Sequence, residues 1–149
     1  MDVQDATNGE ALPDQAQITD WVGAALAGRR ESAELTVRIV DEDEGRAMNE
    51  RWRGGAGATN VLSFPVGEEL AAAPALLGDI VICAPLVRRE AAEQGKPEEA
   101  HWAHLVIHGV LHLLDYDHVD AREAEVMETL ETEVLEGLGY GDPYLREQS

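Results

Sequence analysis

Residues 104–118 read HLVIHGVLHLLDYDH and contain four of the five histidines of the chain. The apolar residues between them predict a buried helix, and a buried helix has no ordinary use for repeated imidazoles. His104, His108 and His112 recur every four residues, so they share one helix face. Histidines at this spacing can bind one cation at nitrogen–metal distances of about 2.0–2.1 Å. The segment therefore predicts a metal site on a helix.

The three helical histidines cannot all bind the same ion. A helix rises about 1.5 Å per residue, which separates His104 from His112 by about 12 Å along the axis. The Asp-Tyr-Asp sequence at 115–117 favours a turn, and a reversal there would return His118 to the ligand face. We therefore predict a metal centre of His108, His112 and His118. Three protein nitrogens with one open position are typical of catalytic zinc.

The two other histidines of this region receive different interpretations. A single histidine on an apolar face is usually a hydrogen-bonded core residue, and this is our interpretation of His101. For His104 we favour a structural role, or a contact that orients a ligand, over direct metal binding. Both residues therefore stay outside the predicted ligand set.

Length and composition limit the class of protein. A chain of 149 residues suits one domain with a real hydrophobic core. The single cysteine, Cys83, allows no internal disulfide and indicates a reducing compartment. We find neither a signal-peptide pattern nor an apolar run of the about 18–20 residues that a membrane span needs. We therefore expect a cytoplasmic protein with no membrane partner.

The charge distribution bears on nucleic-acid binding. The net charge of −19 argues against it, because phosphate contacts need lysine and arginine. Much of the negative charge, however, falls in the glutamate-rich run at residues 123–136. The positive residues collect elsewhere in the chain, at Arg46, Arg51, Arg53, Arg88, Arg89 and Lys96. A local basic cleft on an acidic protein therefore stays open as an alternative.

Hydrophobic periodicity predicts the elements around the metal helix. Residues 1–12 are polar and predict a poorly ordered tail, followed by a single domain over residues 13–149. Helices are predicted from Pro13 to Gly28, Asp41 to Trp52, Pro85 to Glu93, Pro97 to the 115–117 turn, and Asp120 to Gly137. Strands are predicted over 35–40, 60–66 and 76–83.

Several of these elements carry more specific expectations. Strands 35–40 and 60–66, with the helix between them, predict a parallel right-handed unit. Pro65 indicates a strand end or a sheet edge, and the apolar run 76–83 indicates a central strand. A buried acid needs a partner, so Asp79 in that run either orients a nearby arginine or histidine or marks a strand-end turn. The last helix buries a stripe that we interpret as purely structural, at Met127, Leu130, Val134 and Leu138.

Zinc chemistry favours hydrolysis and introduces a rival function. An open three-histidine site lowers the pKa of bound water towards about 7 and polarises carbonyl or phosphoryl oxygen. The histidine spacing matches the H-E-x-x-H-x-x-G-x-x-H pattern of metzincin proteases. Gly109, however, replaces the glutamate that acts as general base, and Asp115 replaces the glycine. A metzincin-like metallopeptidase is therefore the second-ranked function.

The same segment resembles the H-G-x-L-H-L-x-G-Y-D-H signature of the YbeY family, the bacterial endoribonucleases of ribosomal RNA maturation. The resemblance extends to MNERWRG at 48–54, TNVLSFP at 59–65, LGDIVIC at 77–83 and GLGY at 137–140. It covers residues 35–145. Asp115 departs from the pattern, which usually has glycine there. Aspartate can adopt positive φ at modest cost, but a need for close backbone approach would change where His118 lies.

The resemblance implies a zincin-like α+β fold, with a small mixed β-sheet packed with helices and the metal site on a central helix and the following turn. It implies one Zn²⁺ per chain on His108, His112 and His118. It also implies that Arg53 is the functional arginine that holds a phosphate near the metal, as a guanidinium can. Without the resemblance, Arg53 is better interpreted as a solvated arginine at a helix end.

The implied activity is cleavage of single-stranded RNA by a zinc-dependent endoribonuclease. Its implied roles are maturation of the 3′ end of small-subunit ribosomal RNA and ribosome quality control, with the ribosome or its small subunit as partner. A third alternative is a non-catalytic, zinc-stabilised module that binds the ribosome. The sequence leaves open whether water or a ribose 2′-hydroxyl is the nucleophile, and it does not determine the oligomeric state.

Overall fold

The computed structural model describes residues 2–7, 12–27, 34–53, 60–65, 76–114 and 121–140. The strands in these ranges are β1 (Asp2–Ala6), β2 (Glu34–Val40), β3 (Val61–Pro65) and β4 (Leu76–Cys83). The helices are α1 (Gln15–Leu26), α2 (Glu42–Met48), a π-helix (Asn49–Arg53), α3 (Ala84–Gln94), α4 (Glu98–Leu113) and α5 (Ala121–Leu138). The chain therefore has the predicted α+β composition.

The sheet is mixed, with the strand order β1-β2-β4-β3. β1, β2 and β4 are parallel, and β3 is antiparallel to β4. The prediction that strands 35–40 and 60–66 run parallel is therefore wrong. The connection between β3 and β4 spans only residues 66–75. A short connection suits antiparallel neighbours, whereas a parallel neighbour needs a crossover of about a dozen residues or more.

The parallel strand–helix–strand unit is instead β1–α1–β2. The predicted poorly ordered tail does not agree with the structure at residues 2–6, which form β1. β1 pairs with β2 from Asp2 opposite Thr36 to Ala6 opposite Val40, and Val3 packs against the core. The segment DVQDA has little apolar pattern of its own. Its strand conformation therefore depends on backbone pairing with β2, which sequence patterning does not reveal.

Other expectations about the strands can be compared with the structure directly. Pro65 ends β3, which lies at the edge of the sheet, and β4 lies between two strands, as predicted. Asp79 lies within β4, opposite Phe64 of β3, and its side chain is exposed. The strand-end turn is therefore wrong, and Asp79 is not buried as the other alternative assumed.

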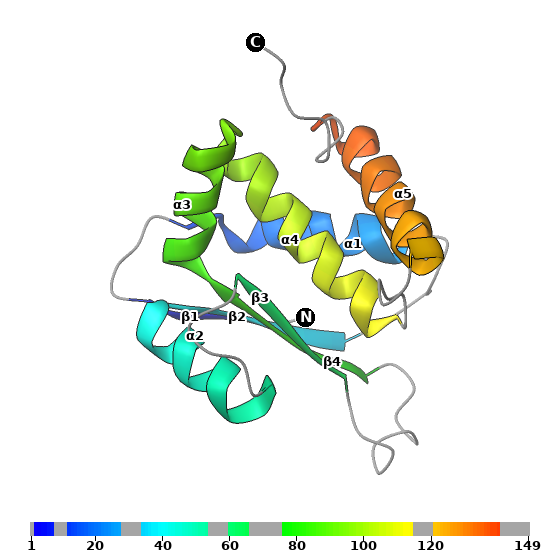
Figure 1. Cartoon of the computed structure of the whole chain (residues 1–149). Helices are drawn as coiled ribbons and strands as arrows, with labels where there is room; N and C mark the ends of the chain where they lie inside the picture. The colour runs from blue at the N-terminus through cyan, green and yellow to red at the C-terminus, as the bar shows by residue number, and fades with distance from the viewer. Residues whose placement is uncertain are drawn as a thin grey trace.

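Helices cover both faces of the sheet, with α1, α4 and α5 on one side and α2 on the other (Figure 1). Successive strand residues point to opposite faces, so β2, β3 and β4 each supply both cores. The larger core, against α1, α4 and α5, receives Leu35, Val37, Ile39, Ile80 and Ile82 from the strands. The smaller core contains Val40, Leu62, Val81 and Cys83, with Met48 of α2 packed against it.

α4 crosses the sheet at very close range, and Gly109 makes this approach possible. The helix begins after Pro97 and has Glu98 and Glu99 in its first turn, as the sequence predicts. A Cβ atom at Gly109 would lie 3.0 Å from Cγ2 of Ile80 on β4. The Ser63 hydroxyl of β3 donates to the Gly109 carbonyl at 3.3 Å. Position 109 therefore faces the sheet.

Substitution of this glycine tests the close packing of α4. We expect Gly109→Ala to lower the free energy of unfolding by about 1–3 kcal/mol, because the added methyl group overpacks against Ile80. Gly23→Ala is the matched control, since Gly23 lies in α1 and a Cβ there meets nothing within 4 Å. The control should raise stability by about 0.5–1 kcal/mol. Urea unfolding measures both, and a Gly109→Ala protein as stable as the parent would contradict the packing account.

Candidate metal centre

The histidines of α4 form a row along one face of the helix. The ring centroids of His101 and His104 are 6.3 Å apart, and those of His104 and His108 are also 6.3 Å apart. The rings of His108 and His112 are closer, at 4.6 Å, and lie nearly perpendicular at 75°. The structure therefore brings together the two helical histidines of the predicted ligand set, at a separation compatible with one shared cation.

A buried carboxylate, Glu131 of α5, lies behind this row. Its Oε1 atom lies 2.8 Å from Nε2 of His104 and 2.9 Å from Nδ1 of His108. The side chain of His108 is 21% exposed, whereas that of Glu131 is 1% exposed. Burial raises the pKa of the Glu131 carboxyl, but the hydrogen bonds from His104 and His108 outweigh burial and hold the pKa at about 2. Glu131 is therefore ionised at neutral pH.

Glu131 is the functional candidate that the sequence interpretation missed. The predicted structural stripe of α5 packs in the larger core, but it did not include position 131. Met127 and Leu135 are fully buried and flank Glu131 at four residues on either side. The available signal was an acidic residue in register with this stripe, at a position where a buried charge needs a partner.

The structure describes the remaining predicted site residues only in part. His118 and Asp115 lie outside the described residues. Arg53 is the last residue of the π-helix, and its side chain also lies outside the described part of the chain. The predicted helix over 41–52 therefore changes from α to π geometry at Asn49. Such π-helical turns are rare and often occur at functional sites.

His101 belongs to a separate network near the start of α4. Its Nε2 lies 2.9 Å from Oε1 of Glu90, which also accepts a 3.0 Å hydrogen bond from the Asn60 amide. Burial lowers the pKa of His101, although the contact with Glu90 opposes this effect. His101 thus joins α4 to α3 and to the residue before β3. This confirms its interpretation as a hydrogen-bonded core residue.

The C-terminal end of α5 is fixed against α1 and α4. Gly139, at φ +92°, ends the helix, and the Tyr140 amide donates to the Leu135 carbonyl at 2.9 Å. The Tyr140 hydroxyl donates to Glu99 of α4 at 2.7 Å and accepts from the Trp21 indole of α1 at 3.3 Å. These contacts set the position of α5 and hence of Glu131.

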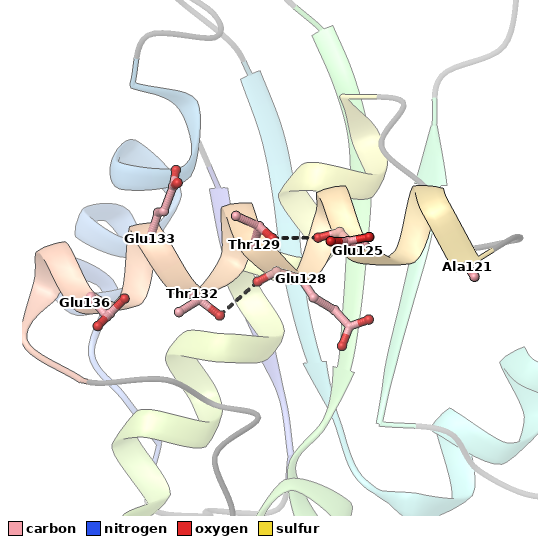
Figure 2. Close-up of a pocket in the computed structure, with 7 residues that line it drawn as sticks. All are labelled: Ala121, Glu125, Glu128, Thr129, Thr132, Glu133 and Glu136. Atoms are coloured by element: carbon pink, nitrogen blue, oxygen red, sulfur yellow. Dashed lines mark hydrogen bonds between the residues drawn. The ribbon is translucent and has the colours of Figure 1, made fainter.

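The face of α5 that points away from the core, opposite the buried face with Glu131, is strongly acidic (Figure 2). A pocket there is lined by Ala121, Glu125, Glu128, Thr129, Thr132, Glu133 and Glu136. The two threonine hydroxyls donate to backbone carbonyls one turn earlier, at 2.7 and 2.9 Å. Four carboxylates on one surface repel phosphate groups, so a nucleic acid would approach a different face.

Two of the arginines considered for a basic cleft form ion pairs. Arg88 contacts Glu98 at 3.2 Å, and Arg89 contacts Glu42 at 3.1 Å. These contacts join α3 to α4 and α2, and they offset positive charge at this surface. No helix in the described ranges combines the length and the apolar character that a membrane crossing requires.

The described residues offer two overlapping sets of metal donors, both of which include His108. One is the His108 and His112 pair. The other joins His104, His108 and Glu131, whose donor atoms all lie within 4.8 Å of one another. Imidazole and carboxylate are both ordinary ligands of zinc, but other divalent metals use them as well. The residues therefore fit a metal ion without fixing its identity.

Fold and site together define an α+β protein with a helix-borne histidine cluster equipped to bind a metal ion. The family model described as Endoribonuclease YbeY matches residues 3–139. The chain belongs to the YbeY family.

Curated relatives resemble the chain over its whole length. "Endoribonuclease YbeY" of Pseudomonas savastanoi pv. phaseolicola is 54% identical, with 100% of this chain and 90% of the relative covered. The protein of the same name from Stutzerimonas stutzeri is 56% identical, with 97% and 90% covered. The solution structure of TM1509 from Thermotoga maritima superposes with a TM-score of 0.61 at 25% identity, covering 97% of this chain and 99% of that one.

Proposed function

We propose that this chain is a zinc-dependent, single-strand-specific endoribonuclease of the cytoplasm. It matures the 3′ end of small-subunit ribosomal RNA and acts in ribosome quality control, with the ribosome or its small subunit as partner. The observation that carries the proposal is the close pair of His108 and His112 in a member of the YbeY family. Relatives that are 54–56% identical bear the name endoribonuclease.

One Zn²⁺ per chain would be held by His108, His112 and His118. Its two helical members support this set, because the imidazoles of His108 and His112 lie 4.6 Å apart on adjacent turns of α4 and a buried carboxylate contacts one of them. When bound, the ion polarises a phosphoryl oxygen and lowers the pKa of water. The fold would then be zincin-like, with the metal helix packed on a mixed sheet. Residues 13–149, extended by β1, would form the single catalytic domain.

Arg53 would hold the scissile phosphate, because a guanidinium binds phosphate oxygens bidentately and stabilises developing negative charge. Its position on a π-helix supports a functional role. β3 begins eight residues after Arg53, and its Ser63 contacts the carbonyl of Gly109, next to His108. The chain therefore returns from the arginine to the metal helix over a short distance in sequence.

The structure gives a reason to rank peptide hydrolysis below RNA cleavage. The metzincin pattern needs a glutamate at position 109, where it would act as general base. Gly109 faces Ile80 in the sheet, and a Cβ atom at this position would lie only 3.0 Å from that side chain. A glutamate there would be directed into the core and away from a substrate. We therefore expect a phosphodiester, and not a peptide bond, at the open coordination position of the metal.

A cleavage assay with a metal-removal arm tests the proposal. The purified protein should cut a labelled single-stranded RNA and leave a duplex of the same sequence intact. Treatment with a zinc chelator should abolish cleavage, and added Zn²⁺ should restore it. Chelator-sensitive digestion of casein would support the peptidase instead. Ribosome binding without cleavage of any RNA would support the non-catalytic module.

A further inference from the structure

Glu131 occupies a position where packing alone would favour an apolar residue. The whole residue is 0% exposed, and its neighbours on the same face of α5, Met127 and Leu135, are each 1% exposed. An ionised carboxylate in such a place costs free energy unless hydrogen bonds compensate for the lost water. Its contacts with two histidines of α4 supply such hydrogen bonds.

These contacts indicate where each histidine carries its hydrogen. The same Oε1 atom contacts Nε2 of His104 at 2.8 Å and Nδ1 of His108 at 2.9 Å. One carboxylate oxygen can accept two hydrogen bonds, and this shared geometry is satisfied when the ring nitrogen on each side is the donor. In a neutral imidazole the other nitrogen then holds the lone pair. For His108 that nitrogen is Nε2.

We propose that Glu131 is a positioning residue for metal binding, which holds the His108 ring with the Nε2 lone pair available to the cation. This inference rests on the proposed function, because it takes His108 as a metal ligand. Histidine ligands commonly donate their second N–H to a carboxylate, which fixes the tautomer and raises the basicity of the ligand. His104 donates to the same oxygen and so orients the carboxylate.

A competing arrangement uses the same residues differently. A cation bound directly by His104, His108 and Glu131 would take Nδ1 of His108, because this is the ring nitrogen that lies 2.9 Å from Oε1 of Glu131. The observed separations of 2.8 and 2.9 Å are ordinary for charge-assisted N–H···O hydrogen bonds. They favour the positioning role. The nitrogen through which His108 binds metal distinguishes the two arrangements.

Nuclear magnetic resonance of isotope-labelled histidine rings shows which nitrogen of His108 carries hydrogen and which binds metal in the parent protein. In the metal-free protein, at a pH where the His108 ring is neutral, long-range proton–nitrogen spectra should show hydrogen at Nδ1 and not at Nε2. Added Zn²⁺ should shift the Nε2 signal. Hydrogen at Nε2 of the neutral ring, or a zinc-induced shift at Nδ1, would overturn the inference. No substitution is needed, so the result does not depend on how a variant folds.

A charge-neutral variant measures the size of the effect. Glu131→Gln keeps the side-chain shape but loses the charge, and the zinc dissociation constant should rise about 10–100-fold. Glu128→Gln is the matched control, because it removes the same charge from the acidic face of α5. Its zinc affinity should equal that of the parent, as measured by competition with a chromophoric chelator. Parent-like affinity in Glu131→Gln, or an equal loss in the control, would overturn the positioning role.

An error in the proposed ligand set can be distinguished from an error in the role of Glu131. A His112→Ala protein that binds zinc as tightly as the parent would reject the ligand set, whatever Glu131 does. The tautomer of His108 in the metal-free parent tests the contact with Glu131 without any bound ion. Neither measurement uses RNA cleavage as its readout.

Discussion

His112→Ala is expected to bind almost no zinc and to lose RNA cleavage. The ring of His112 lies 4.6 Å from that of His108 on the adjacent turn of α4, and the proposed site depends on this pair. Loss of a carboxylate that only orients a metal-bound histidine costs about 10–100-fold in affinity or activity. Loss of a ligand should exceed that range. Elemental analysis of the purified protein and cleavage of single-stranded RNA measure both effects.

His101→Gln provides the matched control for this variant. His101 lies on the same helix but contacts Glu90, and its ring is separated from the predicted ligand pair by His104. We expect His101→Gln to keep its zinc and its activity, with any loss confined to stability. Zinc content near one ion per chain in His112→Ala would contradict the proposed ligand set.

Arg53→Ala is expected to separate metal binding from catalysis. The variant should bind zinc as the parent does, because arginine is not a ligand. Cleavage should fall about 100–1,000-fold, the usual cost of removing one group that stabilises charge in a transition state. Lysine at this position should restore only part of the activity, because an ammonium cannot bind phosphate bidentately. Single-turnover cleavage rates at saturating RNA measure the effect.

Arg51→Ala controls for the loss of one positive charge. Arg51 lies two residues earlier on the same π-helix, and its side chain is exposed. If arginines here act only through general attraction for RNA, both variants should lose activity equally, and the loss should vary with salt concentration. We expect the Arg53 variant to lose far more. Equal losses in the two variants would remove the specific role assigned to Arg53.

The parts of the fold predicted from sequence are those with strong local signals. Pro97 followed by two glutamates gives the start of α4, and the apolar run at 76–83 gives β4 with the same bounds as in the structure. The four-residue spacing of the histidines predicted that they share one face of α4, where the rings of His108 and His112 lie 4.6 Å apart. In each case the decisive chemistry lies within a few neighbouring residues.

The parts that could not be predicted depend on distant partners. β1 forms because its backbone pairs with β2, more than thirty residues away in the chain. The antiparallel direction of β3 follows from its connection to β4 and not from its own composition. Glu131 looks like one more glutamate in an acidic run, and only the packing of α5 on α4 brings it to His104 and His108.

Anomalous scattering at the zinc absorption edge, from crystals of the zinc-bound protein, tests the metal centre most directly. We expect one strong peak per chain at about 2.0–2.1 Å from a ring nitrogen of each of His108, His112 and His118. For His108 that nitrogen is Nε2. A peak coordinated by His104, Nδ1 of His108 and Glu131, with His112 and His118 outside bonding distance, would contradict it.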